Sequence, residues 1–210
     1  MGSGGVAPDR SELLLLPMAM ITPGDALLVG DVQHDFLPGG SLAVPGGDEI
    51  VPILARYLAM FQSKGLPIFA IRDWHPANHC SFRERGGIWP VHCVAGSKGA
   101  QFHPDLHFPP STVIISKATD PNREAYSGFQ GTSLEERLRA AGVQRLFIGG
   151  LATDYCVLNT VKDARARGFS VCLLVDAIRA VNLHPDDGRK AEEEIVRLGA
   201  TPLRYENLTG

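Results

Sequence analysis

Cys156 is the residue of this chain best placed to act as a nucleophile. The apolar segment 145–148 predicts a buried strand, a glycine pair ends it, and a helix is predicted over residues 154–167. The cysteine would then lie in the first turn of a helix, where unpaired N–H groups and the helix dipole favour a thiolate over a thiol. A thiolate can attack a carbonyl carbon at neutral pH. The alternative is a small buried hydrophobe, which is the usual role of a free cysteine.

Two charged residues, Asp31 and Lys117, also follow predicted strands. A nucleophilic cysteine needs a proton acceptor and a positive field, which a carboxylate and an ammonium group supply. We therefore predict Asp31 as the base and Lys117 as the group that stabilises the thiolate. Each has a simpler alternative, since a carboxylate can cap a strand end and a lysine can extend to the surface.

Acidic and imidazole side chains gather in the long segment 73–110, which is rich in His, Pro and Gly. The candidate metal ligands are Asp73, His75, His79 and His92. Carboxylate and imidazole suit zinc, manganese or ferrous iron. Cys80 and Cys93 lie beside these histidines, but the chain lacks the paired Cys-x-x-Cys spacing of a structural zinc site. Solvated histidines in a polar loop are the alternative.

Small residues precede the cysteine at Gly149, Gly150 and Ala152. They would let a substrate approach the backbone closely. The N–H groups of Ala152 and Cys156 could then form an oxyanion hole. A plain turn between strand and helix is a compatible interpretation.

The elements that must position these residues alternate along the chain. Strands are predicted over residues 26–29, 67–71, 112–115, 145–148, 171–175 and 201–204, and helices over 49–64, 132–142, 154–167 and 185–198. This alternation is typical of a parallel sheet covered on both faces. Carboxyl ends of parallel strands meet at one edge, so the reactive side chains are expected to share one site there. A loop as long as 73–110 is usually functional.

Composition limits the class of protein. The chain has 210 residues, 44% hydrophobic and 20% charged, with a net charge of −3. These values suit one domain and predict neither nucleic-acid nor membrane partners. Four cysteines do not suggest a disulfide framework, so we expect a reducing, cytoplasmic location. Residues 1–20 are predicted to be a tag or disordered extension, and residues 21–208 a single domain.

The order of these motifs resembles a known family over about residues 25–204. The matching segments are 29–36, 38–43, 72–79, 89–94, 116–117, 126–129 and 150–157. They are similar to the nicotinamidases of the isochorismatase-like cysteine hydrolase superfamily. The Asp-x-His pair with two further histidines narrows the match, since isochorismatases and related amidohydrolases generally lack that metal site. Ala118, Gly30 and the short segment 82–89 depart from the common pattern.

The resemblance implies a doubly wound, mainly parallel six-stranded sheet with helices on both faces. It implies a triad of Cys156, Asp31 and Lys117, and a cis peptide before Ala152. It also implies one divalent metal, with zinc the first choice and manganese or iron the alternatives. The predicted ligands are Asp73, His75, His79 and His92, and the predicted residues around the substrate ring are Phe36, Trp89 and Tyr126.

The function that follows from the resemblance is hydrolysis of nicotinamide to nicotinic acid and ammonia through a thioester, in NAD salvage. The metal would hold the pyridine nitrogen. Pyrazinamide is a candidate analogue, and self-association is common in the family. A first alternative is hydrolysis of another small amide or a vinyl ether by the same triad. A second is a thiol-based redox or metal-binding protein without turnover, which would leave Asp31 and Lys117 without a role.

Overall fold

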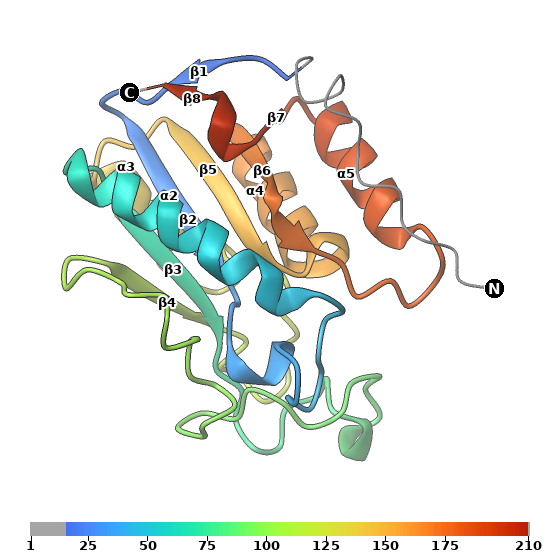
Figure 1. Cartoon of the computed structure of the whole chain (residues 1–210). Helices are drawn as coiled ribbons and strands as arrows, with labels where there is room; N and C mark the ends of the chain where they lie inside the picture. Colours follow the sequence, from blue (N-terminus) through green and yellow to red (C-terminus); the bar gives the residue numbers. More distant parts are fainter. Residues whose placement is uncertain (1–15, 210) are drawn as a thin grey trace.

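Six parallel strands form the central sheet of this computed structural model, which describes residues 16–209 (Figure 1). The strand order is β4-β3-β2-β5-β6-β7, and every neighbouring pair is parallel. The bounds are β2 Asp25–Gly30, β3 Ile68–Asp73, β4 Val113–Lys117, β5 Arg145–Leu151, β6 Ser170–Arg179 and β7 Thr201–Leu203. The predicted α/β fold with a six-stranded parallel sheet is confirmed.

Helices cover both faces of this sheet, as predicted. Helix α2 (Val51–Ser63) lies across one face (Figure 1). Its buried side chains share a hydrophobic core with Leu27 and Val29 of β2. The other face, which carries Ala26 and Leu28 of β2, is covered by the remaining helices of residues 16–209. These are α3 (Leu134–Ala140), α4 (Leu158–Ala166) and α5 (Asp187–Arg197). Alternate residues of β2 thus enter separate cores, because successive side chains of a strand point to opposite faces.

The order in which the chain adds strands to the sheet reverses next to β2. It runs from β2 through β3 to the edge strand β4, and then returns to β5 on the other side of β2. The connections from β2 to β3 and from β3 to β4 pack on the face that α2 covers, whereas the connections that follow β4 pack on the other face. The loops after β2 and β5 therefore diverge. Ligands of doubly wound sheets bind at such a switch point, beyond the carboxyl ends of the strands.

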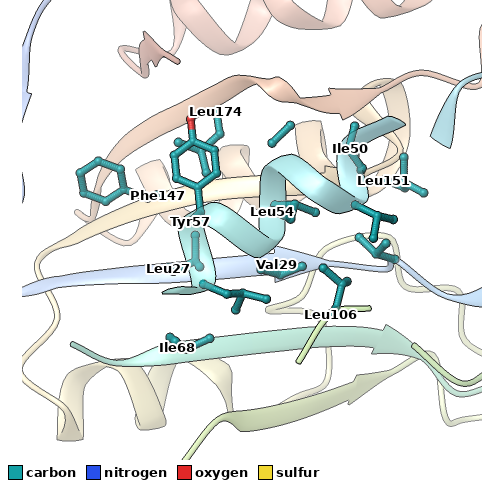
Figure 2. Close-up of a cluster of buried hydrophobic side chains, with 14 of the residues drawn as sticks. Leu27, Val29, Ile50, Leu54, Tyr57, Ile68, Leu106, Phe147, Leu151 and Leu174 are labelled. Atoms are coloured by element: carbon teal, nitrogen blue, oxygen red, sulfur yellow. The ribbon is translucent and has the colours of Figure 1, made fainter. Parts of the chain in front are cut away.

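Helix α2 owes its position to apolar side chains at helical spacing. Leu54, Tyr57, Leu58 and Phe61 are all buried, and Figure 2 shows Leu54 and Tyr57 directed toward the sheet. A 3-10 turn, Gly47–Ile50, precedes the helix, so the α-helix begins later than the predicted residue 49. Residues 16–209 contain no helix with the length and apolar character needed to cross a bilayer.

Leu54→Ala is expected to lower the free energy of unfolding by about 2–5 kcal/mol, because it leaves a cavity under a fully buried side chain. Gln62→Ala, at an exposed position of the same helix, should change it by less than about 0.5 kcal/mol. Urea unfolding followed by circular dichroism measures both. Equal effects of the two substitutions would show that this helix does not anchor the core.

The predicted capping box at residues 132–135 forms only in part. Thr132 Oγ1 accepts a hydrogen bond from the Leu134 N–H at 3.2 Å, although Ser133 stands at the N-cap of α3. Glu135 pairs with Arg139 and Arg167, at 2.8 and 3.1 Å, instead of closing the box. Ion pairs within α3 and with the neighbouring helix therefore take the place of the second capping contact.

A few residues of the predicted extension 1–20 lie within the described range. Ala19–Met20 form a short strand, β1, that pairs in parallel with β8 (Leu208–Thr209). Arg145 donates a hydrogen bond to the Met20 carbonyl at 2.7 Å. The ordered structure thus includes part of the predicted extension 1–20, whereas residues 1–15 lie outside the described range.

Candidate active site

The three predicted catalytic residues meet at the carboxyl edge of the sheet. Asp31 directly follows β2, Lys117 ends β4, and Cys156 lies in the π-helical turn Thr153–Val157 after β5. Lys117 Nζ lies 3.5 Å from Cys156 Sγ and 3.3 Å from Asp31 Oδ2. All three side chains are buried, so one ammonium group contacts both the thiol and the carboxylate in a protected space.

Burial strongly affects the pKa values of Cys156, Asp31 and Lys117. It raises the pKa of Cys156 well above that of a free thiol, despite the opposing effect of the Lys117 ammonium. Burial likewise raises the pKa of Asp31 to about 6, against the same ammonium. Burial opposes the charge of Lys117, but the carboxylates of Asp31 and Asp73 raise its pKa overall. Cys156 therefore rests as a thiol, not as the thiolate that a helix N-terminus alone would favour.

Asp31 is equipped to remove the thiol proton. Its Oδ1 atom is buried and has no hydrogen-bond partner among residues 16–209, whereas Oδ2 faces Lys117. A carboxylate with a pKa near 6 is a stronger base than an exposed aspartate. A base and a positive charge beside the thiol allow a thiolate to form when a substrate is present.

The backbone around Cys156 has an unusual geometry. The Leu151–Ala152 peptide is cis, as the family resemblance predicts. The Ala152 carbonyl accepts hydrogen bonds from the N–H groups of Tyr155 and Val157, both at 3.1 Å, but not from that of Cys156. The N–H groups of Ala152 and Cys156 stay candidates for an oxyanion hole, because Ala152 and Cys156 both line the pocket described below.

Gly150 has a packing role that sequence reasoning did not identify. Its φ is +127°, and a side chain there would collide with the Gly30 carbonyl of the neighbouring strand β2. This close approach of two strands brings the segments that carry Asp31 and Cys156 together. Glycine is thus needed at position 150 because the two strands come so close, and not to give a substrate access to the backbone.

Three of the four predicted metal ligands form one buried cluster. Asp73, His75 and His92 each offer an atom within 4.8 Å of the others. His75 Nε2 lies 3.2 Å from His92 Nε2 and 3.5 Å from Asp73 Oδ2. The Nδ1 atoms face the carbonyls of Ala118 (3.3 Å) and Pro90 (2.8 Å).

This donor set fits a divalent cation. A carbonyl only accepts hydrogen bonds, so each histidine carries its proton on Nδ1 and presents an Nε2 lone pair to the other. Burial lowers the pKa of His92 to about 4, which keeps that ring neutral. Two lone pairs and a carboxylate oxygen repel one another unless a cation lies between them, and carbonyl acceptors at Nδ1 are typical partners of metal-bound histidines. The cluster could therefore hold a metal ion.

His79 is not part of this cluster. Its Nδ1 lies 2.8 Å from Ser81 Oγ and its Nε2 lies 3.1 Å from the Arg123 carbonyl. Both ring nitrogens are thus engaged, and the ring packs against His75 with centroids 4.3 Å apart. The arrangement favours three protein ligands and gives His79 a supporting position behind one of them.

Asp73 connects the Asp-His-His cluster to the triad of Asp31, Lys117 and Cys156. One carboxylate oxygen contacts Lys117 Nζ and the other faces His75 and His92. Although burial opposes its charge, Lys117 and His75 lower the pKa of Asp73 below its usual range. Gln33, a buried residue that sequence reasoning missed, accepts a hydrogen bond from the Asp73 N–H and donates one to its carbonyl, both at 2.8 Å.

A pocket with aromatic walls joins the thiol to the metal cluster. Its lining includes Cys156 and Ala152 together with Asp73, His75 and His92. The aromatic lining residues are Phe36, Trp89, Tyr126 and Tyr155. Trp89 donates a hydrogen bond to the Tyr126 hydroxyl at 3.0 Å and packs against Tyr155 at 5.0 Å between ring centroids. Tyr155, which the sequence did not single out, completes a wall suited to a flat ring.

A thiol with an adjacent base, inside a doubly wound sheet, is the arrangement of a cysteine hydrolase. Residues 25–206 match the model of the Isochorismatase domain family. The chain belongs to the isochorismatase family.

The most informative relatives are similar over nearly their whole length. The nicotinamidase of Escherichia coli (strain K12) is 41% identical over 200 residues, which are 85% of this chain and 94% of the relative. The crystal structure of the pyrazinamidase of Pyrococcus horikoshii in complex with zinc is 50% identical, with a TM-score of 0.84 over 87% of this chain and 100% of that one. PnC1 from L. infantum in complex with nicotinate is 37% identical, with a TM-score of 0.84 over 92% and 99%.

Proposed function

We propose that this protein hydrolyses nicotinamide to nicotinic acid and ammonia. The observation that carries the proposal is one pocket lined by a buried thiol, an Asp-His-His cluster and aromatic side chains. A ring that carries both a nitrogen and a carboxamide offers a group to the cluster and a group to the thiol. Similarity to a nicotinamidase and to a protein in complex with nicotinate supports the same substrate.

The metal in this proposal is zinc, held by Asp73, His75 and His92. Nitrogen and oxygen ligands of this kind suit zinc, and a similar structure contains it. When bound, zinc acts as a Lewis acid that attracts the lone pair of the pyridine nitrogen and so fixes the ring. His79 bonds Ser81 and the Arg123 carbonyl through its two ring nitrogens, so the proposal assigns it no metal contact.

Cys156 and Asp31 carry the bond changes in this mechanism. Asp31 takes the thiol proton, and Cys156 Sγ attacks the carboxamide carbon. Lys117 balances the charge of the thiolate, and the N–H groups of Ala152 and Cys156 stabilise the oxyanion. Asp31 then gives its proton to the leaving nitrogen, so ammonia departs and a thioester stays on Cys156. Asp31 next takes a proton from water, whose oxygen attacks the thioester and releases nicotinic acid, and the proton returns to the thiol.

The substrate proposal is tested with amides that differ at one end of the ring. The zinc-loaded, reduced protein should hydrolyse nicotinamide and pyrazinamide, whereas benzamide, which lacks the ring nitrogen, should have a kcat/KM lower by about 100-fold or more. Equal rates for benzamide and nicotinamide would show that the metal cluster does not recognise the ring. Activity on a vinyl ether or a non-aromatic amide, with none on nicotinamide, would favour the alternative hydrolase.

Trp89→Ala is expected to raise the KM for nicotinamide by about tenfold, because it removes an aromatic wall and the hydrogen bond to Tyr126. The change in kcat should be smaller, since the hydrogen bonds of the triad do not involve Trp89. Trp74→Ala is a matched control, because Trp74 packs under Arg72 rather than in the pocket. Initial rates over a range of nicotinamide concentrations measure both. An unchanged KM in Trp89→Ala would remove this residue from the substrate site.

A further inference from the structure

Asp35 connects three loops around the pocket and has no role in the mechanism above. Its Oδ2 atom accepts a hydrogen bond from the Cys93 N–H at 2.7 Å, and its Oδ1 accepts one from the Ser41 N–H at 3.4 Å. Its own N–H donates to the Gly99 carbonyl at 3.0 Å, and its carbonyl accepts from the Leu42 N–H at 2.9 Å. Every one of these partners is a backbone group, so the contacts fix chain positions rather than side chains.

The Cys93 backbone, which Asp35 contacts, is linked to two candidate metal ligands, His92 and His75. Cys93 follows His92 in the chain, and its carbonyl accepts a hydrogen bond from the His75 N–H at 3.0 Å. The carbonyl of His75 in turn accepts one from the Ala95 N–H at 2.8 Å. The Cys93 backbone is thus held at its N–H by Asp35 and at its carbonyl by the segment of His75.

The conformation of Cys93 requires such support. Its φ is +45°, in the left-handed region that a residue with a side chain seldom occupies. This conformation is strained and persists only where surrounding contacts enforce it. The hydrogen bond that the Cys93 N–H donates to the Asp35 carboxylate is one such contact, and His92 is the residue directly before Cys93.

Gly99 provides independent support for the importance of this contact. A side chain at Gly99 would collide with the carboxylate of Asp35, although the φ of Gly99 is not in the left-handed region. Glycine is therefore needed here for space and not for backbone freedom. The loop of Gly99 closes over Asp35 and leaves only enough room for the carboxylate that holds Cys93.

We propose that Asp35 is a positioning residue that directs His92 toward Asp73 and His75 through its hydrogen bond to the Cys93 N–H. This inference rests on the proposed metal site, but not on the identity of the substrate. Loss of the Asp35 carboxylate would free the Cys93 peptide, turn His92 away from the cluster and weaken metal binding without removing a ligand.

Zinc affinity is the quantity that tests this role. The affinity is measured by competition with a chromophoric chelator, without nicotinamide, for the unsubstituted protein and for Asp35→Ala, Asp35→Asn and Gly99→Ala. Asp35→Ala and Gly99→Ala should each bind zinc about 10–100-fold more weakly, the range seen when a supporting partner of a metal ligand is lost. Asp35→Asn should keep an affinity close to that of the unsubstituted protein, because an amide oxygen still accepts from Cys93. Asp105→Asn, at an exposed position, is the control and should change nothing.

Other outcomes would overturn the proposal. Unchanged zinc affinity in both Asp35→Ala and Gly99→Ala would show that His92 keeps its direction without Asp35. Loss of the native circular dichroism spectrum in both would assign to Asp35 a role in folding instead. If the unsubstituted protein binds zinc but does not hydrolyse nicotinamide, the proposed function fails while the role of Asp35 is still decided by the affinities.

Discussion

Cys156→Ala is expected to lower kcat for nicotinamide by about four orders of magnitude or more, since it removes the atom that forms the thioester. Asp31 would have no thiol proton to remove, and Lys117 no thiolate to stabilise. The substitution removes only one buried sulfur, so the fold and the metal cluster should persist. Formation of nicotinic acid, followed by liquid chromatography at saturating nicotinamide, measures the loss.

A matched control separates loss of the nucleophile from loss of a buried thiol. Cys172 is also buried and free, but it lies on β6 within the hydrophobic core, outside the pocket. Cys172→Ala should therefore keep kcat close to that of the unsubstituted protein. Near-normal activity in Cys156→Ala would end the covalent mechanism, whatever the substrate.

Asp73→Asn is expected to reduce metal content and activity together. The amide is neutral, so zinc loses its anionic ligand and Lys117 keeps Asp31 as its single carboxylate contact. Zinc affinity should fall by about 100-fold or more, which exceeds the effect of losing a supporting partner. Excess zinc should restore only part of kcat, because Asp73 also holds Lys117. Metal analysis by mass spectrometry and initial rates measure the two effects.

Asp176→Asn is the control for this prediction. Asp176 accepts hydrogen bonds from the Tyr57 hydroxyl and the Tyr205 N–H, both at 2.9 Å, away from the pocket. Its substitution should lower thermal stability but leave zinc content and kcat unchanged. Full zinc content and full activity in Asp73→Asn would contradict both roles assigned to Asp73.

The sheet could be predicted because its signal is local. Segments such as 145–148 and 171–175 are mostly apolar, and a glycine pair follows the first of them. The second segment lies in β6, which extends past the predicted end to Arg179. Strands β1 and β8 could not be predicted, because two residues carry no periodic pattern and the pairing joins opposite ends of the chain. The role of Glu135 could not be predicted for a related reason. The choice between a capping box and an ion pair depends on where Arg167 lies, and Arg167 is distant in the sequence.

The site was predictable only in part. Asp31, Lys117 and Cys156 follow strands whose ends must converge, so their proximity follows from the topology. The protonation state of Cys156 does not, because it depends on the depth of burial. His79 has the residue type of a ligand, and only the structure shows that Ser81 and Arg123 engage both its nitrogens. Gln33 and Asp35 act on backbone groups distant in the sequence, a role that no residue type reveals.

Equimolar release of ammonia and nicotinic acid from nicotinamide tests the central claim most directly. The measurement uses the purified protein, reduced and loaded with zinc, with its fold checked by circular dichroism. The account predicts repeated turnover with one ammonia for each nicotinic acid. No release of either product from that preparation would contradict the proposal that nicotinamide is the substrate of this site.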